Sequence, residues 1–114
     1  MGYYSEVVFK NIKILKDKIG EFNKEIKALK ISKNAPEWVS EFGDIKANND
    51  GSITLEYDYG KFYDDENFAK FLSRFVNSGE IIFYGEDGTI WGYRFENDKI
   101  LKLETMLVER GVLK

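Results

Sequence analysis

The sequence predicts an α+β fold, a two-layer sandwich in which two main helices cover one face of a mostly antiparallel sheet. The strongest observation is the segment 79–104, where the turn dipeptides Asp87-Gly88 and Asn97-Asp98 separate three short apolar and aromatic runs. That pattern is typical of an antiparallel three-stranded meander. The second observation is the helical spacing of apolar residues in the segments 12–29 and 68–76. An amphipathic helix must bury its apolar face, so these helices are expected to pack on the sheet.

The first half of the single domain, residues 1–114, is predicted to contain a strand, a long helix and a short helix. Residues 3–10 are rich in aromatic and β-branched side chains, which favour a strand. Asn11 can cap a helix whose apolar stripe runs from Ile12 to Leu29 in steps of three and four. Pro36 and Gly43 suit the start and the end of a short helix.

The second half is predicted to hold a hairpin, a second helix and the meander. The turn sequence Asn-Asn-Asp-Gly at 48–51 is followed by one alternating strand, 52–59, with Tyr57 and Tyr59 on one face and Glu56 and Asp58 on the other. A helix then begins at the acids 64–65, and the last strands cover 80–85, 89–96 and 99–104. The tail 105–114 is compatible with a further helical turn or two. The predicted order is β-α-(short α)-β-β-α-β-β-β.

The composition excludes several classes of chemistry. The chain has no cysteine and no histidine, so it carries no thiolate nucleophile, no cysteine-bound zinc and no Ser-His-Asp triad. We therefore predict a non-enzymatic protein with no cofactor and no bound metal. Neither a signal peptide nor a run of about 20 apolar residues is present. We expect a cytoplasmic protein without membrane contact.

The charge is unevenly distributed along the chain. The net charge of −3 argues against direct binding of nucleic acid. Residues 10–33 contain eight lysines against three acids, whereas residues 41–66 contain eight acids against two lysines. One interpretation is a pair of solvated faces of opposite sign. The other is an acidic patch that meets a basic partner.

Two separate parts of the sequence carry a resemblance. The opening Met-Gly-Tyr-Tyr and the later Gly85-Glu86-Asp87 turn, followed by Trp91, Tyr93, Phe95 and Lys99, resemble a set of small, mostly uncharacterised phage and bacterial proteins. The likeness does not extend over residues 11–60. It implies a small α+β domain of phage or mobile-element origin, and it implies no activity.

The leading hypothesis is a protein-binding module, such as a phage-encoded inhibitor of a host defence system of the CRISPR kind. Its partner would be a protein with a basic surface, for example a nucleic-acid-binding host or defence protein. On a regular strand the carboxylates of Glu56 and Asp58 would lie about 7 Å apart, close to the phosphate spacing of a nucleic-acid strand. Tyrosines are expected to anchor the interface. The predicted surface comprises Glu41, Asp44, Glu56, Tyr57, Asp58, Tyr59, Tyr63, Asp64, Asp65 and Glu66.

The alternative hypothesis is a small carboxylate-based enzyme, or a metal- or ligand-binding protein, that uses an edge of the meander. For Arg94 the competing interpretation is a cross-strand ion pair with Glu80 or Glu104. For Glu86 and Asp87 the competing interpretation is a polar turn without a binding role. The sequence also leaves open whether the protein is a monomer or a homodimer built on the apolar stripe of residues 12–29. The alternative site comprises Glu80, Glu86, Asp87, Arg94 and Glu96.

Overall fold

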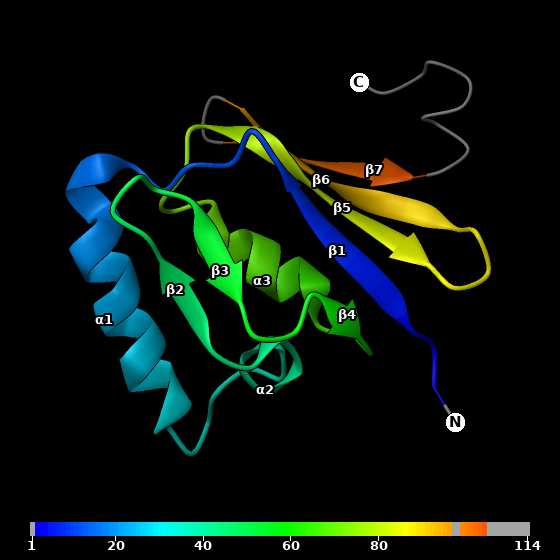
Figure 1. Ribbon diagram of the computed structural model, residues 1–114, viewed down its shortest axis with the longest axis horizontal. Helices are drawn as coiled ribbons and strands as arrows, with labels where there is room; N and C mark the ends of the chain where they lie inside the picture. The colour runs from blue at the N-terminus through cyan, green and yellow to red at the C-terminus, as the bar shows by residue number, and fades with distance from the viewer. Residues whose placement is uncertain (1, 97–98, 105–114) are drawn as a thin grey trace.

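The computed structural model describes residues 2–96 and 99–104 of the chain (Figure 1). The predicted turn at Asn97-Asp98 and the predicted helical turns of the tail lie outside these residues. In chain order the elements are β1 (Ser5–Lys10), a 3-10 turn (Lys16–Lys18), α1 (Ile19–Lys30), α2 (Trp38–Phe42), β2 (Ile45–Ala47), β3 (Ile53–Leu55), β4 (Tyr59–Gly60), α3 (Asp65–Leu72), β5 (Ser78–Gly85), β6 (Ile90–Glu96) and β7 (Lys99–Glu104). None of the helices in the described part is long and apolar enough to cross a membrane.

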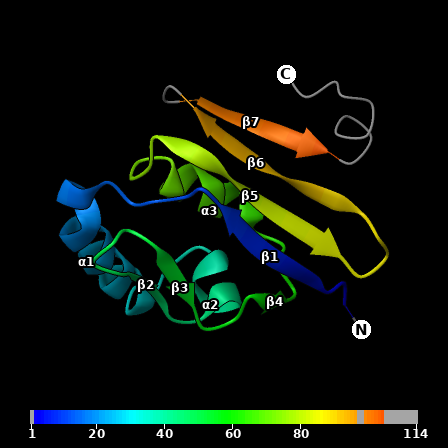
Figure 2. The same ribbon diagram turned by 45° about the horizontal axis from the view of Figure 1, so that its top comes forward.

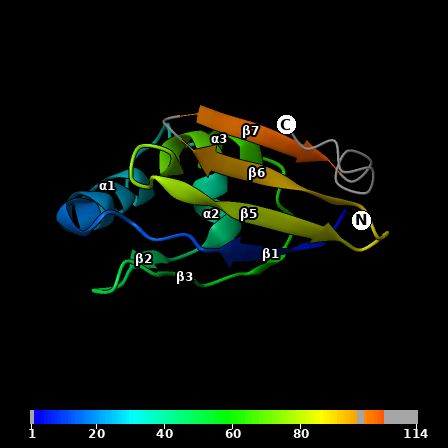
Figure 3. The ribbon, with the colours of Figure 1, turned by 90° about the horizontal axis from the view of Figure 1, so that it is seen from above.

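The strands form two antiparallel sheets. The larger sheet has the order β4-β1-β5-β6-β7, and β2 pairs only with β3. Figure 2 shows the five strands side by side with α3 behind β5. In Figure 3 the pair β2–β3 lies beyond β1, on the side away from β7. The predicted α+β fold and its meander are confirmed, and the short strand β4 is an addition to the predicted order.

Alternation along the strands separates an inner face, which packs on the helices, from an outer face. Val7 on β1 pairs with Phe83 on β5, which pairs with Trp91 on β6, and all three point inward. Phe83 is fully buried, and its ring stacks on the ring of Trp91 at 5.3 Å. The neighbouring positions, such as Glu6 and Tyr84, therefore belong to the outer face.

Helix α3 joins the layers through Phe68, which is fully buried. Its ring centroid lies 4.4 Å from that of Phe42 and 5.1 Å from that of Trp38, both on α2, and 6.5 Å from that of Phe9 on β1. Burying aromatic rings of this size supplies most of the favourable free energy of such a core. The contacts of Phe68 therefore fix α3 relative to both α2 and the sheet.

The predicted start of the first long helix is wrong. The helix was expected at Asn11, but α1 begins at Ile19, after a 3-10 turn. The backbone N–H of Ile14 donates to the carbonyl of Gly51, and that of Leu15 donates to the carbonyl of Phe75. These long-range hydrogen bonds replace the local bonds of a helix, so the apolar residues at 12 and 14 are buried from an extended segment.

The predicted strand over residues 52–59 is also interrupted. β3 ends at Leu55 and pairs with β2, whereas β4 begins at Tyr59 and pairs with β1. Between them the N–H of Tyr57 donates to the carbonyl of Phe42, which turns the chain away from a regular ladder. Glu56 and Asp58 lie in this connection, so the spacing expected for their carboxylates on one strand does not apply.

Two glycines give a matched test of the packing. A Cβ on Gly20 in α1 would meet nothing within 4 Å, whereas a Cβ on Gly92 in β6 would lie 2.1 Å from the carbonyl oxygen of Ile81. We expect Gly20→Ala to raise the free energy of unfolding by about 0.5–1 kcal/mol, because it removes the entropic cost of a helical glycine. We expect Gly92→Ala to lower it by about 2 kcal/mol or more through backbone overlap.

Urea unfolding of both variants, followed by circular dichroism, measures these changes. Equal effects of the two substitutions would contradict the close approach of β5 and β6 at Gly92.

Candidate functional site

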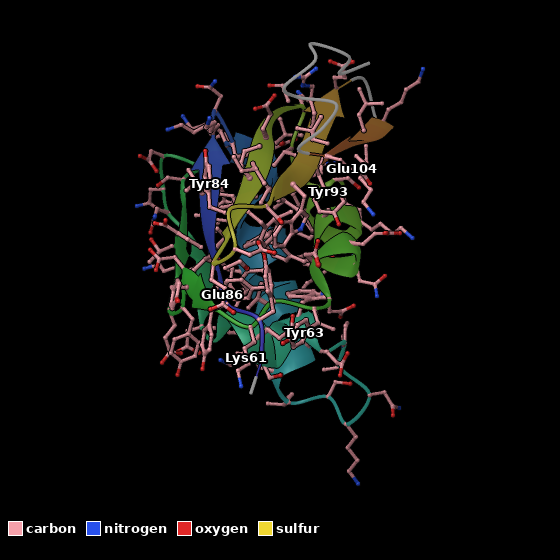
Figure 4. All side chains as sticks on the ribbon, turned by 90° about the vertical axis from the view of Figure 1, so that its right-hand side faces the viewer. Lys61, Tyr63, Tyr84, Glu86, Tyr93 and Glu104 are labelled. Atoms are coloured by element: carbon pink, nitrogen blue, oxygen red, sulfur yellow. The ribbon has the colours of Figure 1, made fainter. Side chains whose placement is uncertain are left out.

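A cleft of about 610 Å³ opens where the start of α3 and the loop before it face the inner side of β6 and β7. The register of the meander pairs Trp91 with Glu104 and Tyr93 with Lys102, so these four residues form one wall. Figure 4 shows Tyr93, Glu104 and Tyr63 toward the side of the molecule that carries α3, with Tyr84 on the opposite side. The lining consists of Tyr3, Phe62, Tyr63, Asp65, Glu66, Thr89, Ile90, Trp91, Tyr93, Lys102 and Glu104.

The carboxylate of Asp65 ties the two walls of the cleft together. Its Oδ2 accepts a hydrogen bond from Trp91 Nε1 at 3.0 Å and another from the Tyr93 hydroxyl at 2.6 Å. Burial and, next in size, the hydrogen bond to Asp65 raise the pKa of the Tyr93 hydroxyl far above its ordinary value. Tyr93 therefore stays protonated and continues to donate to Asp65 throughout the physiological range.

Carboxylates of the acidic segment hold the loop that precedes α3. Glu41 on α2 accepts the backbone N–H groups of Tyr63 and Asp64, each at 3.1 Å. Burial raises the pKa of Glu41, although these two N–H groups oppose the shift. Asp64 does not cap α3 with its side chain; its carboxylate accepts from the N–H of Trp38 and from Nδ2 of Asn67 instead. α2 and the start of α3 are thereby locked together.

The N-terminal segment closes one end of the cleft. The Tyr3 hydroxyl donates to the carboxylate of Asp87, its backbone N–H donates to the Tyr63 hydroxyl at 2.8 Å, and its ring lies 6.1 Å from that of Trp91. A Cβ at position 85 would lie 1.6 Å from the Tyr3 hydroxyl oxygen, so glycine allows this tyrosine to approach as it does. The hydrogen bond lowers the pKa of Asp87 and raises that of Tyr3.

The cleft combines aromatic rings with an excess of negative charge. Among the lining residues that the structure describes, five are aromatic, and Asp65, Glu66 and Glu104 face one lysine, Lys102. The face of an aromatic ring is negative, so rings and carboxylates together attract a cation more strongly than either does alone. The arrangement suits a positively charged group.

Several residues of the predicted acidic surface make contacts within the fold. Asp44 is ion-paired with Lys30, and Glu56 accepts the backbone N–H of Asp44 at 3.0 Å. Glu41 and Asp64 are used within the fold, as described above. Of the predicted acids, only Asp65 and Glu66 lie in the cleft, and Glu66 is also 3.4 Å from Lys70. The exposed Asp58 lies in the connection between β3 and β4.

The three predicted tyrosine anchors lie in different places. Tyr63 lines the cleft and is 60% exposed. Tyr59 stacks on Tyr4 at 5.5 Å, on the outer face of the sheet. Tyr57 lines a second hollow, between α1 and α2, and a hydrogen bond to Glu56 raises its pKa. Only Tyr63 therefore stands beside the acids of the cleft.

The residues of the alternative site separate into two pairs and one further acid. Glu80 accepts hydrogen bonds from the Arg94 guanidinium at 2.9 Å, which is the cross-strand ion pair anticipated for this arginine. Glu86 and Asp87 lie beyond the other end of β5 and hold the N-terminal segment. Glu96 is exposed at the end of β6, opposite Ser78. Within the described residues, no group of three or more acids is placed to hold a metal ion.

Sequence reasoning missed much of the cleft. Trp91 and Tyr93 are two residues apart on β6, and so are Lys102 and Glu104 on β7. Residues with this spacing lie on one face of a strand, so each shared face could have been predicted from the sequence. The pattern does not show that the start of α3 faces them. That placement depends on contacts between residues far apart in the sequence.

Comparison of the chain with protein-family models, with curated proteins and with solved structures found no match. The resemblance noted from the sequence therefore remains a prediction.

The buried hydroxyl of Tyr93 gives a test by pH. Its pKa is raised in the folded state, so the folded protein keeps this proton when the unfolded chain, with a pKa of about 10, loses its own. The associated stability is fully present below that value and is lost as the pH rises above it. We expect the free energy of unfolding to fall more steeply between about pH 9 and about pH 11 in the wild type than in Tyr93→Phe.

Urea unfolding at several pH values measures both slopes. The other six tyrosines are common to both proteins and cancel in the comparison. Parallel slopes would show that Tyr93 ionises alike in the folded and the unfolded protein, which would contradict its burial beside Asp65.

Proposed function

We propose that the chain is a non-enzymatic protein-binding module that takes a basic segment of a partner protein at the cleft and its acidic rim. One observation carries the proposal: five aromatic residues and three carboxylates line the same cleft with one lysine. Tyrosine and tryptophan dominate the centres of protein interfaces. Charge of one sign around a concave surface steers a partner of the opposite sign toward it.

Rigidity of the cleft supports this function. Trp91 and Tyr93 both donate hydrogen bonds to Asp65, and the Tyr63 hydroxyl accepts the N–H of Tyr3. Side chains that are already held in place lose little conformational entropy when a partner binds. Tyr63 nevertheless exposes 60% of its surface, so its ring remains available for contact.

The acids outside the cleft contribute less to this surface. Asp44 and Asp50 pair with Lys30 and Lys13, which come from the lysine-rich segment 10–33. Part of the sequence's acidic excess is therefore neutralised within the protein. The binding surface narrows to Asp65, Glu66 and Tyr63 from the predicted set, joined by Trp91 and Glu104 from the meander.

A narrower form of the proposal is that the partner is a nucleic-acid-binding defence protein and the chain its phage-encoded inhibitor. Its support is the resemblance of residues 1–4 and 85–99, together with the negative cleft, which suits a basic surface. Competition with nucleic acid for the partner would distinguish an inhibitor from another binding module.

Charge reversal in the cleft tests the proposed function. We expect the double variant Glu66→Lys with Glu104→Lys to bind a short peptide of lysine, arginine and glycine about tenfold more weakly than the wild type does. Titration calorimetry at low and at physiological salt measures the affinity, which is expected to decrease with salt.

The matched control is Glu6→Lys with Glu96→Lys, which makes the same change of net charge on the outer face of the sheet. It is expected to bind the peptide with nearly the wild-type affinity. If the two double variants weaken binding equally, the peptide responds to overall charge and the cleft is not the binding site.

A further inference from the structure

We infer that the cleft selects an arginine side chain of the partner over a lysine side chain. This inference rests on the proposed function and adds the chemistry of the recognised group. The guanidinium is expected to lie flat against an aromatic wall of the cleft, with its N–H groups directed at Asp65 and the neighbouring carboxylates.

The carboxylate of Asp65 is only partly used within the fold. Its Oδ2 accepts both hydrogen bonds, from Trp91 and from Tyr93, and no donor within residues 2–96 and 99–104 is seen to reach its Oδ1. Asp65 is half-buried and lines the cleft. A carboxylate oxygen in such a position forms a stronger hydrogen bond with a charged donor than it does in open water.

The distribution of acceptors favours a guanidinium over an ammonium. Asp65 and Glu66 project from the first turn of α3, and Glu104 projects from the end of β7 across the cleft. A guanidinium has five N–H donors spread around a plane, so one group can address carboxylates on different walls. An ammonium is a compact and strongly hydrated charge that loses more solvation in the same place.

The aromatic wall is fixed in a way that suits a flat ligand. Trp91 stacks on Phe83 with ring centroids 5.3 Å apart, the tilted ring of Tyr3 lies 6.1 Å away, and the indole N–H is bonded to Asp65. Tyr63 stands on the other side with its hydroxyl fixed by the N–H of Tyr3. Guanidinium groups stack on such rings, whereas an ammonium makes only a point contact with them.

The size of the cleft indicates a peptide rather than an isolated side chain. Its volume of about 610 Å³ lies within the usual range for ligand sites and exceeds the volume of one side chain. Among the described residues of the lining Lys102 is the one cation, and it lies on the same face of β7 as Glu104. Its charge opposes that of an incoming guanidinium, so its removal is expected to strengthen binding.

The experiment uses three blocked tripeptides, Gly-Arg-Gly, Gly-Lys-Gly and Gly-citrulline-Gly. Citrulline has nearly the shape of arginine without its charge. Two-dimensional nitrogen–proton NMR follows the indole N–H of Trp91 during each titration, and the indole of Trp38, which is 2% exposed in the core, serves as the internal reference. We expect saturable shifts of Trp91 with the arginine peptide, about threefold or more weaker binding of the lysine peptide, and no binding of the citrulline peptide.

Variants of the cleft complete the test. Asp65→Asn keeps an oxygen that accepts hydrogen bonds from Trp91 and Tyr93. It is expected to lower the affinity for the arginine peptide about tenfold. Glu104→Gln on the opposite wall gives a second variant if Asp65→Asn does not fold. Lys102→Met is expected to strengthen binding, and Glu6→Gln on the outer face is the control expected to leave it unchanged.

Two results would overturn the inference, and they have different consequences. Equal or tighter binding of the lysine peptide at Trp91 would refute selection of arginine, while the proposed binding of basic segments would stand. If neither basic peptide shifts the Trp91 resonance, both the inference and the proposed function are wrong.

Discussion

The packing of α3 through its phenylalanines is the constraint on which the rest of the structure depends. Phe68 contacts β1 and α2, and Phe71, one turn further along, lies 5.7 Å from the ring of Phe22 on α1. These contacts leave α3 one position relative to the sheet, because a close-packed core tolerates few alternatives. In that position the first residue of the helix, Asp65, reaches the side chains of Trp91 and Tyr93. The cleft is therefore a consequence of how the core is filled.

Electrostatic contacts within the fold change how the acidic segment should be interpreted. The basic segment 10–33 and the acidic segment 41–66 lie against each other through α1 and β2, and two ion pairs, Lys13–Asp50 and Lys30–Asp44, join them. Exposed pairs of this kind contribute little to stability, but they reduce the field that a partner would experience. In the cleft, Asp65 and Glu66 from α3 and Glu104 from β7 place negative charge beside aromatic rings. Concentration in a concave site makes that charge more effective than the same charge spread over a surface.

The opening residues of the chain and the turn between β5 and β6 touch each other in the structure. Tyr3 lies across Gly85 and donates to Asp87, and Tyr4 exchanges backbone and side-chain hydrogen bonds with Glu86. The opening residues and the turn between β5 and β6 therefore form one unit that closes an end of the cleft. This contact gives each residue a physical role. Gly85 has no Cβ and lets Tyr3 approach, and the carboxylate of Asp87 accepts the hydrogen bond of the Tyr3 hydroxyl.

Local pattern determined the α+β class, the meander and its alternating faces, because each depends on residues that are close in sequence. It also marked Asp65, Glu66 and Tyr63 as candidates for binding, on charge and residue type alone. The structure decided where α1 begins and where the strand after Gly51 breaks, since the N–H groups of Ile14 and Tyr57 bond to carbonyls far away in the chain. It likewise decided that Asp65 is hydrogen-bonded to Trp91, 26 residues further along the chain. Asp44 instead pairs with Lys30, and Glu56 accepts the backbone N–H of Asp44. Such pairings are set by the packing of the whole core, and no short stretch of the sequence contains the information that fixes them.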